Sequence, residues 1–269
     1  MGNFTDGKLK VLDLFAGIGG FTLGLEKINL YETVAFCEWD KKAQAVLKKH
    51  WPSTHCYGDI KTLEYKDGHL YSEDCGTSCF TKIDVITGGF PCQDISYAGK
   101  GEGLEGERSG HWYEYLRLIS EIKPKGVIIE NVSALRTRGL GTVLRGLDSV
   151  GYDAEWHCIP AAALGACHQR DRIWVLAYSR SEGGQGLVPL QHLGEIGQGR
   201  WGGKENLQQI YNNPFGRSDL WPEPLIRRMD VQLTGRLDRL KQVGNSIYWP
   251  IAKILGKHLH ENMMRAGLV

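Results

Sequence analysis

The sequence predicts an α/β fold, in which helices cover a sheet with buried parallel strands. The first observation is an apolar strand candidate at 11–15, which runs into the turn Ala16-Gly17-Ile18-Gly19-Gly20 and then into helical spacing. The second is that helical segments alternate with further short apolar runs at 33–37, 84–87, 126–132 and 173–177. Strand, glycine turn and helix in this order open Rossmann-like folds, so we predict a Rossmann-like sheet.

The composition is that of a globular chain. Its 269 residues, 42% hydrophobic and 23% charged, fit one large domain or a large domain plus a small one. The seven cysteines are odd in number and scattered, with no signal peptide ahead, which indicates free thiols in a reducing, cytoplasmic setting. No apolar run approaches the roughly 18 residues that span a membrane. The net charge of +1 favours no class of partner, so nucleic-acid binding would require local positive charge.

The glycine turn after the first strand is a candidate ligand site. Glycines let the backbone approach a ligand that a Cβ would exclude, although they also serve ordinary tight packing. The turn departs from G-x-G-x-x-G, which counts against a dinucleotide and leaves open an adenosyl ligand without pyrophosphate. Glu38 ends the second strand, 21 residues after Gly17, where such folds place the acid that binds ribose hydroxyls. The alternative is a solvated acid at a strand end.

A third short strand ends at Gly58-Asp59-Ile60. Asp59 could accept a hydrogen bond from an adenine amino group, or it could simply form a turn. We expect the polar stretch 61–82 to be irregular. The cysteines in and before it lack the spacing of a zinc site, so no metal is expected.

The stretch 84–96 carries the candidate nucleophile. Two glycines end its apolar run, and Pro91 fixes φ so that a loop presents Cys92 beyond the carboxyl end of the strand. A thiol in that place acts as a nucleophile if a neighbouring charge lowers its pKa, whereas most lone cysteines are small buried hydrophobes. The glycine-rich segment 99–106 is either a loop that closes over substrate or a plain surface loop.

Charged groups occupy two further positions beside predicted strands. Glu130 lies near the end of the strand 126–132, where an unused buried carboxylate would be costly. Arg170 and Arg172 precede the strand 173–177 and could fix an anion or steady other site residues; the alternative is a surface ion pair with Asp171. The remaining expected elements are helices at 41–51, 112–122, 136–150 and from Pro250, and a strand at 152–158.

Nearly end to end and in order, these residues resemble the DNA cytosine-5 methyltransferases, particularly the compact phage- and prophage-type members. The matching segments are 13–20, 36–39, 58–60, 89–93, 130–132, 170–172 and 244–246. Single motifs of this kind occur by chance, whereas seven in order are highly specific. One departure is His168, where the family usually has Gln.

The resemblance implies a Rossmann-like, S-adenosylmethionine-dependent methyltransferase sheet and methyl transfer to C5 of cytosine in a specific sequence of double-stranded DNA. Cys92 would add to C6 of a flipped-out cytosine, Glu130 would hold or protonate N3, and Arg172, paired with Arg170, would steady the base or its backbone. The implied S-adenosyl-L-methionine contacts are Phe15, Gly17, Ile18, Gly19, Glu38, Trp39, Asp59, Ile60, Pro91, Asn245 and Ser246. Two alternatives stay open: an RNA (tRNA) cytosine-5 methyltransferase with the same motifs, and a catalytically inactive DNA-binding relative.

The resemblance also divides the chain into a catalytic and cofactor-binding domain at 1–180, a short target-recognition region at 181–236 and a C-terminal segment at 237–269 that returns to the catalytic domain. Residues 181–203 hold eight glycines in 23 positions and show neither helical nor strand periodicity. Arginines farther along the recognition region could read guanine or contact phosphates, whereas the alternative is an ordinary insertion that covers the site. We expect a cytoplasmic monomer in a bacterial or phage-infected cell, with no membrane association. The target sequence cannot be read from the chain.

Overall fold

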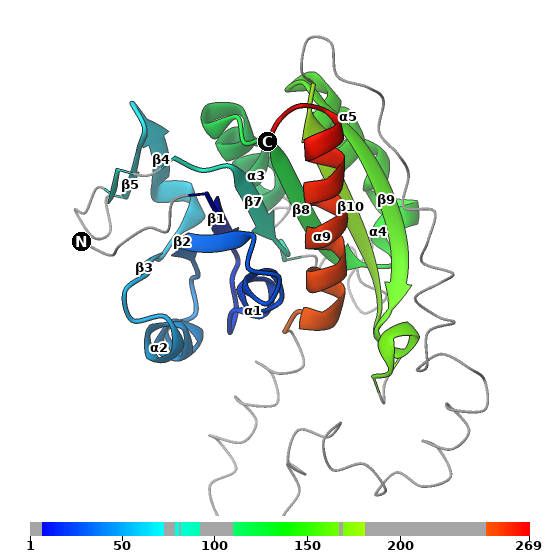
Figure 1. The fold of residues 1–269 in the computed structure, drawn as a ribbon, viewed down its shortest axis with the longest axis horizontal. Helices are drawn as coiled ribbons and strands as arrows, with labels where there is room; N and C mark the ends of the chain where they lie inside the picture. The colour runs from blue at the N-terminus through cyan, green and yellow to red at the C-terminus, as the bar shows by residue number, and fades with distance from the viewer. Residues whose placement is uncertain (1–6, 73–78, 81, 92–109, 167–168, 181–245) are drawn as a thin grey trace, which may run out of the picture.

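The computed structural model describes residues 7–72, 79–80, 82–91, 110–166, 169–180 and 246–269. Within these ranges a seven-stranded sheet has the order β3-β2-β1-β7-β8-β10-β9 (Figure 1). The strands are β1 (Leu9–Leu14), β2 (Tyr31–Cys37), β3 (His55–Tyr57), β7 (Val85–Gly88), β8 (Gly126–Val132), β9 (Tyr152–Pro160) and β10 (Asp171–Ser179). The first five in spatial order pair in parallel, and β10 runs antiparallel between β8 and β9. The predicted α/β sheet is confirmed.

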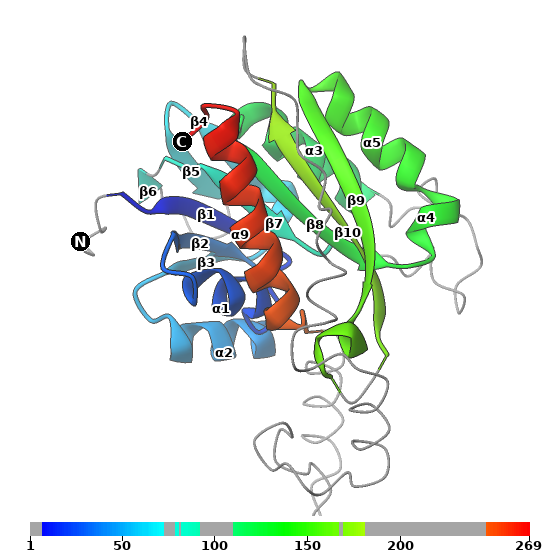
Figure 2. The ribbon, with the colours of Figure 1, turned by 45° about the vertical axis from the view of Figure 1, so that its right-hand side comes forward.

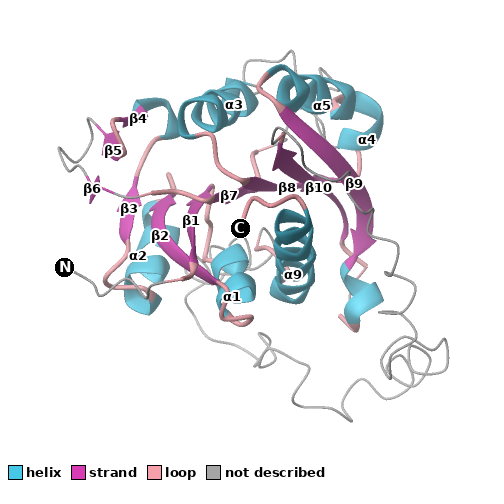
Figure 3. Ribbon diagram, turned by 45° about the horizontal axis from the view of Figure 1, so that its top comes forward, coloured by secondary structure: helices cyan, strands magenta, loops and turns pink. Residues whose placement is uncertain are grey.

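Helices cover both faces of this sheet, so that the molecule has three layers (Figure 3). One face carries α1 (Gly20–Glu26), α2 (Lys41–His50) and α9 (Trp249–Arg265). The other face carries α3 (Gly110–Ile122), α4 (Leu135–Arg138) and α5 (Leu140–Ser149). Two short 3-10 helices, η1 (Ile60–Thr62) and η4 (Ala161–Leu164), follow β3 and β9.

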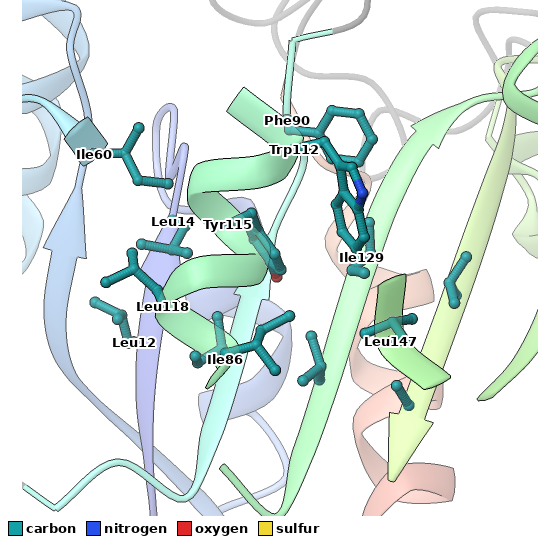
Figure 4. Packing of buried hydrophobic residues seen from close by; sticks show 14 of the residues in the cluster. Leu12, Leu14, Ile60, Ile86, Phe90, Trp112, Tyr115, Leu118, Ile129 and Leu147 are labelled. Atoms are coloured by element: carbon teal, nitrogen blue, oxygen red, sulfur yellow. The ribbon is translucent and has the colours of Figure 1, made fainter. Parts of the chain in front are cut away.

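Alternation of side chains along the strands builds a hydrophobic core on each face. On β1, Leu12 and Leu14 belong to one core and Val11 belongs to the other. Figure 4 shows the first core, in which side chains of α3 pack against the sheet. Its fully buried members include Leu14, Ile86, Trp112, Tyr115, Leu118 and Ile129. Burial of each such side chain contributes about 1.5–3 kcal/mol, which makes this face a rigid platform for the strand ends.

The second core joins the first helix to the last, because α1 and α9 lie side by side (Figure 2). Two glycines permit the close approach. A Cβ on Gly24 would lie 2.5 Å from the backbone oxygen of Trp249, and a Cβ on Gly256 would overlap the side chain of Leu25. The hydroxyl of Tyr31 donates to the Gly256 carbonyl at 2.7 Å, which links residues 225 positions apart.

The expectation that 61–82 is irregular was wrong. A separate antiparallel sheet forms there from β4 (Leu63–Lys66), β5 (His69–Ser72) and β6 (Cys79–Phe80). Asp67 and Gly68 connect β4 to β5, and both have positive φ, 52° and 78°. Asp-Gly favours this kind of tight hairpin turn, so the signal was present and the polar composition around it obscured it. The expected helix at 136–150 is also interrupted, because Gly139 separates α4 from α5.

The described ranges also provide findings on the cysteines, on metal binding and on membrane-spanning helices. Cys37, Cys56 and Cys158 are free thiols, and no cluster of three or more His, Cys, Asp or Glu side chains in these ranges could hold a metal ion. No described helix is both long and apolar enough to cross a membrane. Cys92, the segment 99–106, His168, Asn245 and the region 181–236 lie outside the described residues. The division into three regions therefore stays a prediction.

Candidate active site

The candidate site residues gather at the edge of the sheet where the parallel strands have their carboxyl ends. Phe15 follows β1, Glu38 follows β2, and Gly89 to Pro91 follow β7. Because β10 is antiparallel, its first residues reach the same edge, and Arg172 pairs in register with Val132 at the end of β8. Open α/β sheets bind ligands at this edge, so the topology places the predicted residues where chemistry is expected.

The turn after β1 has an unusual backbone. Phe15 has φ of 51°, which is rare for a bulky residue and occurs mainly where the surrounding structure enforces it. Its ring packs edge-on against His111 and parallel to Tyr115, with ring centroids 5.7 and 6.3 Å away. Gly17 and Gly19 also have positive φ, and a Cβ on Gly19 would lie 2.5 Å from the Trp51 ring. Only glycine therefore fits at position 19, while Ile18 beside it is half-buried.

Glu38 contacts this turn directly. Its Oε2 accepts a hydrogen bond from the Gly17 backbone N–H at 2.7 Å, and its Oε1 accepts one from the Asp40 backbone N–H at 2.7 Å. Burial raises the pKa of Glu38, and these backbone hydrogen bonds oppose the shift. The spacing of 21 residues thus does bring Glu38 to the glycine turn, and the reading as a solvated acid at a strand end is wrong.

The next residues differ in exposure. Trp39 is 73% exposed beside Glu38, which leaves a large apolar ring available to a ligand. Asp59 accepts a hydrogen bond from the Lys61 backbone N–H at 2.9 Å and thereby caps η1, so its predicted turn-forming role is present. Ile60 is only 3% exposed and packs into the core with α3. Its side chain helps to fix the position of Asp59.

At the end of β7 the backbone comes very close to Glu130. A Cβ on Gly89 would lie 2.8 Å from Glu130 Oε2, so glycine is required for the carboxylate to sit there. Phe90 is buried, Pro91 is exposed, and Cys92 is the next residue along the chain. The backbone carbonyl of Phe90 accepts a hydrogen bond from Asn131 Nδ2 at 3.2 Å. Neighbouring residues of β8 therefore contact the segment that leads to Cys92 at two points.

The two arginines have different partners. Arg172 Nε lies 2.9 Å from Glu130 Oε1, and the two side chains are 23% and 12% exposed. Burial raises the pKa of Glu130, and the positive charges of Arg172 and Arg170 oppose the shift. Arg170 has φ of 37° and donates from Nη2 to the Ser246 carbonyl at 2.8 Å. Arg172 meets Asp171 only at its backbone carbonyl, so its ion pair is with Glu130 and not with Asp171.

The segment before α9 returns to the glycine turn. A Cβ on Gly20 would lie 2.7 Å from the Cβ of Ile247, so Ile247 rests against the start of α1. Ser246 is held by Arg170 from the other side. Ser246 and Ile247 therefore lie beside the start of α1, while Asn245 lies outside the described residues.

A family model described as C-5 cytosine-specific DNA methylase matches residues 9–211. The chain belongs to this family. Type II methyltransferase M.CviJI of Paramecium bursaria Chlorella virus IL3A is 32% identical over 212 residues, covering 78% of this chain and 53% of that protein. Type II methyltransferase M1.ScrFI of Lactococcus lactis subsp. cremoris is 29% identical over 239 residues, covering 85% of this chain and 56% of that protein. The chain thus spans about half the length of these curated relatives.

Solved structures share the fold of this C-5 cytosine methylase family member. A mutant of Spodoptera frugiperda DNMT2 superposes with a TM-score of 0.58 at 14% identity, covering 94% of this chain and 100% of that chain. The S. pombe Dnmt2 methyltransferase gives a TM-score of 0.51 at 21% identity, covering 66% of this chain and 52% of that chain. At these identities the likeness supports the architecture only.

Reasoning from the sequence missed one polar network in this C-5 cytosine methylase fold. Asp13 is fully buried and accepts hydrogen bonds from the hydroxyls of Thr22 at 2.9 Å and Thr87 at 2.8 Å, and Thr33 donates to Thr22 at 3.0 Å. Burial raises the pKa of Asp13 to about 7, against the effect of these hydrogen bonds. The network ties β1, β2, β7 and α1 together directly beneath the glycine turn. A buried Asp within an apolar strand was the signal.

Proposed function

We propose that the chain transfers a methyl group from S-adenosylmethionine to C5 of a cytosine in duplex DNA, through a covalent bond between Cys92 and C6 of the flipped-out base. The observation that carries the proposal is the position of Glu130. Arg172 holds its carboxylate beside Gly89, at the strand end that leads to Cys92. Membership of the C-5 cytosine-specific DNA methylase family supports the same chemistry.

Glu130 and Cys92 have complementary roles in this proposal. Cytosine C5 is a poor nucleophile, and addition of the Cys92 thiolate to C6 makes C5 enamine-like. Negative charge develops on the ring as the thiolate adds, and a proton held by Glu130 at N3 disperses it. Burial raises the pKa of Glu130, which favours the protonated form, while Arg172 fixes the direction of the carboxyl group. After methyl transfer a base removes the C5 proton, and elimination breaks the bond to Cys92.

The residues around the glycine turn fit an adenosyl ligand. A Cβ on Gly17 would meet no atom within 4 Å, so a ligand can approach the backbone of the turn closely. Bound there, S-adenosylmethionine supplies an electrophilic methyl group. The carboxylate of Glu38, fixed by two backbone N–H groups, would accept hydrogen bonds from the ribose hydroxyls, and the exposed Trp39 ring would cover an apolar surface of the ligand.

Trapping on a fluorinated substrate tests the proposal. A duplex with 5-fluorocytosine at the target should form a denaturation-resistant adduct, because fluorine cannot leave as a cation in the elimination step. Cys92→Ser should abolish both this adduct and methyl transfer to unmodified DNA. An adduct that persists in Cys92→Ser and is lost with another cysteine would refute the assignment.

The choice of nucleic acid needs its own comparison. Duplex DNA and tRNA should be offered side by side with S-adenosylmethionine, and we expect transfer to DNA. Transfer to tRNA alone would establish the RNA alternative. If the chain bound DNA but transferred no methyl group to either substrate, it would be the catalytically inactive DNA-binding relative.

A further inference from the structure

The exposed face of α2 is strongly basic. It carries four exposed lysines around the small, exposed Ala45, namely Lys41, Lys42, Lys48 and Lys49. Because seven residues are close to two helical turns, Lys48 lies in line with Lys41, about 10 Å farther along the helix. Lys49 follows Lys42 in the same way. We call this surface the lysine face of α2.

This concentration of charge contrasts with the chain as a whole. The sequence has 32 Lys and Arg against 31 Asp and Glu, a formal net charge of +1. The ten residues of α2 alone include four lysines and no acid. On two other helices a basic side chain has an acid one turn away, because Arg117 of α3 pairs with Glu121 and Lys257 of α9 lies 3.8 Å from Glu261. The lysine face thus provides local positive charge in a nearly neutral chain, which nucleic-acid binding requires.

The helix dipole explains only half of the lysine face. Positive side chains are stabilised near the C-terminus of a helix, which explains Lys48 and Lys49 in the last turn of α2. Lys41 and Lys42 occupy the first turn, where the positive end of the dipole repels them and acids are favoured. The side chain of Asp40 caps this end by accepting a hydrogen bond from the Lys42 backbone N–H at 2.9 Å, and it offsets part of the repulsion. An anionic ligand on the lysine face would offset the rest.

The lysine face lies near the candidate active site. α2 starts directly after Asp40, whose backbone N–H donates to Glu38 Oε1 at 2.7 Å. Figures 1 and 2 show α2 at the same end of the molecule as the start of α9, the helix that follows Ser246 and Ile247. α2 also leads from β2 to β3, the outermost strand of the described sheet on that side. The lysine face therefore lies to one side of the position at which Glu130 would meet a target base.

We propose that the lysine face of α2 binds the phosphate backbone of duplex DNA on one flank of the target site. The inference rests on the proposed function and adds a DNA contact outside the active site. A duplex carries about one negative charge per 1.7 Å of its axis, so a face about 10 Å long meets several phosphates. Lysine binds phosphate as a point charge on a flexible stem, which contributes affinity without preference for sequence. The competing explanation is that the four lysines are only a solvated surface.

Salt-dependent DNA binding by the full-length chain separates the two explanations. The double variant with Lys41→Gln and Lys42→Gln removes two charges and keeps side chains that suit a helix. On a duplex with long flanks around the target, we expect the slope of log K against log salt to decrease by about two and the affinity to fall about tenfold. The same two substitutions at Lys253 and Lys257, both exposed on α9, are the matched control and should leave the slope unchanged. A slope equal to that of the wild type in the α2 variant would overturn the inference.

The length of the duplex shows where the charges act. Stepwise shortening of the flanks should remove the difference between the α2 variant and the wild type, because a short duplex no longer reaches α2. A difference that persists on the shortest duplex still methylated would place the effect at the active site and overturn the inference. If the wild type itself formed no adduct with 5-fluorocytosine DNA, the proposed function would be rejected instead.

Two measurements without DNA exclude an indirect effect. The Kd of S-adenosylhomocysteine should be unchanged in the α2 variant, since the backbone hydrogen bonds to Glu38 remain. The Tm should equal or exceed that of the wild type, because the two lost charges oppose the helix dipole. Cofactor binding weakened by the same factor as DNA binding would overturn the inference. A lower Tm with an unchanged salt slope would show that the lysines stabilise the fold, and would overturn it as well.

Discussion

The side chain of Asn131 donates a hydrogen bond to the backbone carbonyl of Phe90, two residues before Cys92. Its own carbonyl oxygen accepts from the Val132 backbone N–H at 2.8 Å, which fixes the orientation of the amide. Asn131 is 1% exposed, so water cannot easily replace it. We therefore expect Asn131 to position the segment that leads to Cys92, the proposed nucleophile.

Replacing Asn131 by Asp should impair catalysis and spare cofactor binding. The substitution keeps the shape and removes the donor, so Phe90 loses its anchor. We expect the rate of adduct formation with 5-fluorocytosine DNA to fall about 10- to 100-fold, the usual effect of a misplaced catalytic group. Single-turnover kinetics measure this rate, and calorimetry of S-adenosylhomocysteine is the control. A rate equal to that of the wild type would show that Phe90 is held by other contacts.

Substitutions of Glu38 and Glu130 should impair different properties, since Glu38 contacts the glycine turn and Glu130 contacts the end of β7. Glu38→Ala should weaken S-adenosylmethionine binding by about 1.5–3 kcal/mol, the contribution of a charged hydrogen bond. Glu130→Ala should leave that affinity nearly unchanged and slow turnover by roughly 100-fold or more. Glu32→Ala is a control on β2, the strand that leads to Glu38, because Glu32 pairs with Lys10 away from the site. Equal losses of binding in the two site variants would contradict this division of roles.

Asp13 should make stability depend on pH. Its folded pKa of about 7 lies above the ordinary value of 3.8, so between pH 4 and 7 the folded state binds more protons than the unfolded state. The free energy of unfolding should therefore fall as pH rises through this window, by roughly 3–4 kcal/mol from this group alone. Asp13→Asn stays neutral and should lack this contribution. Urea unfolding of both proteins at several pH values measures the difference. If the free energy of unfolding depended on pH in the same way in both, Asp13 would not cause the pH dependence.

A groove lies where β8 ends and β10 begins, and we expect the DNA backbone to bind there. Its lining residues are Ser133, Ala134, Arg136, Thr137, Cys158, Pro160 and Asp171. Arg136→Ala should weaken binding to all duplex sequences alike and reduce the slope of log K against log salt by about one. Arg145→Ala removes the same charge from an exposed position on α5, outside the groove, and should leave the slope unchanged. Identical slopes for both variants would place the backbone elsewhere.

The sequence predicted the parallel part of the sheet because its strands are short, apolar and separated by helical periodicity. The spacing of 21 residues assigned Glu38 to the ligand site of the glycine turn, and the strand–helix–strand unit does bring its carboxylate to the Gly17 N–H. The sequence did not predict that Arg172 pairs with Glu130, since the two are brought together by β10 entering the sheet antiparallel. The contact of Asn131 with Phe90 was equally hidden, because it joins a side chain to a backbone carbonyl that is distant in the chain. Local pattern carries no information on such contacts.

The pairing of α1 with α9 has a consequence for how the protein is made. Leu25 and Tyr31 lie in the second core, which also needs Ile251, Leu255 and Leu259 of α9. During synthesis these helical residues leave the ribosome only after the whole stretch 181–245. Until then the early strands and α1 expose an apolar face, which favours aggregation of the nascent chain. A chain truncated before Trp249 would therefore aggregate through its exposed apolar surface, and would not merely be less active.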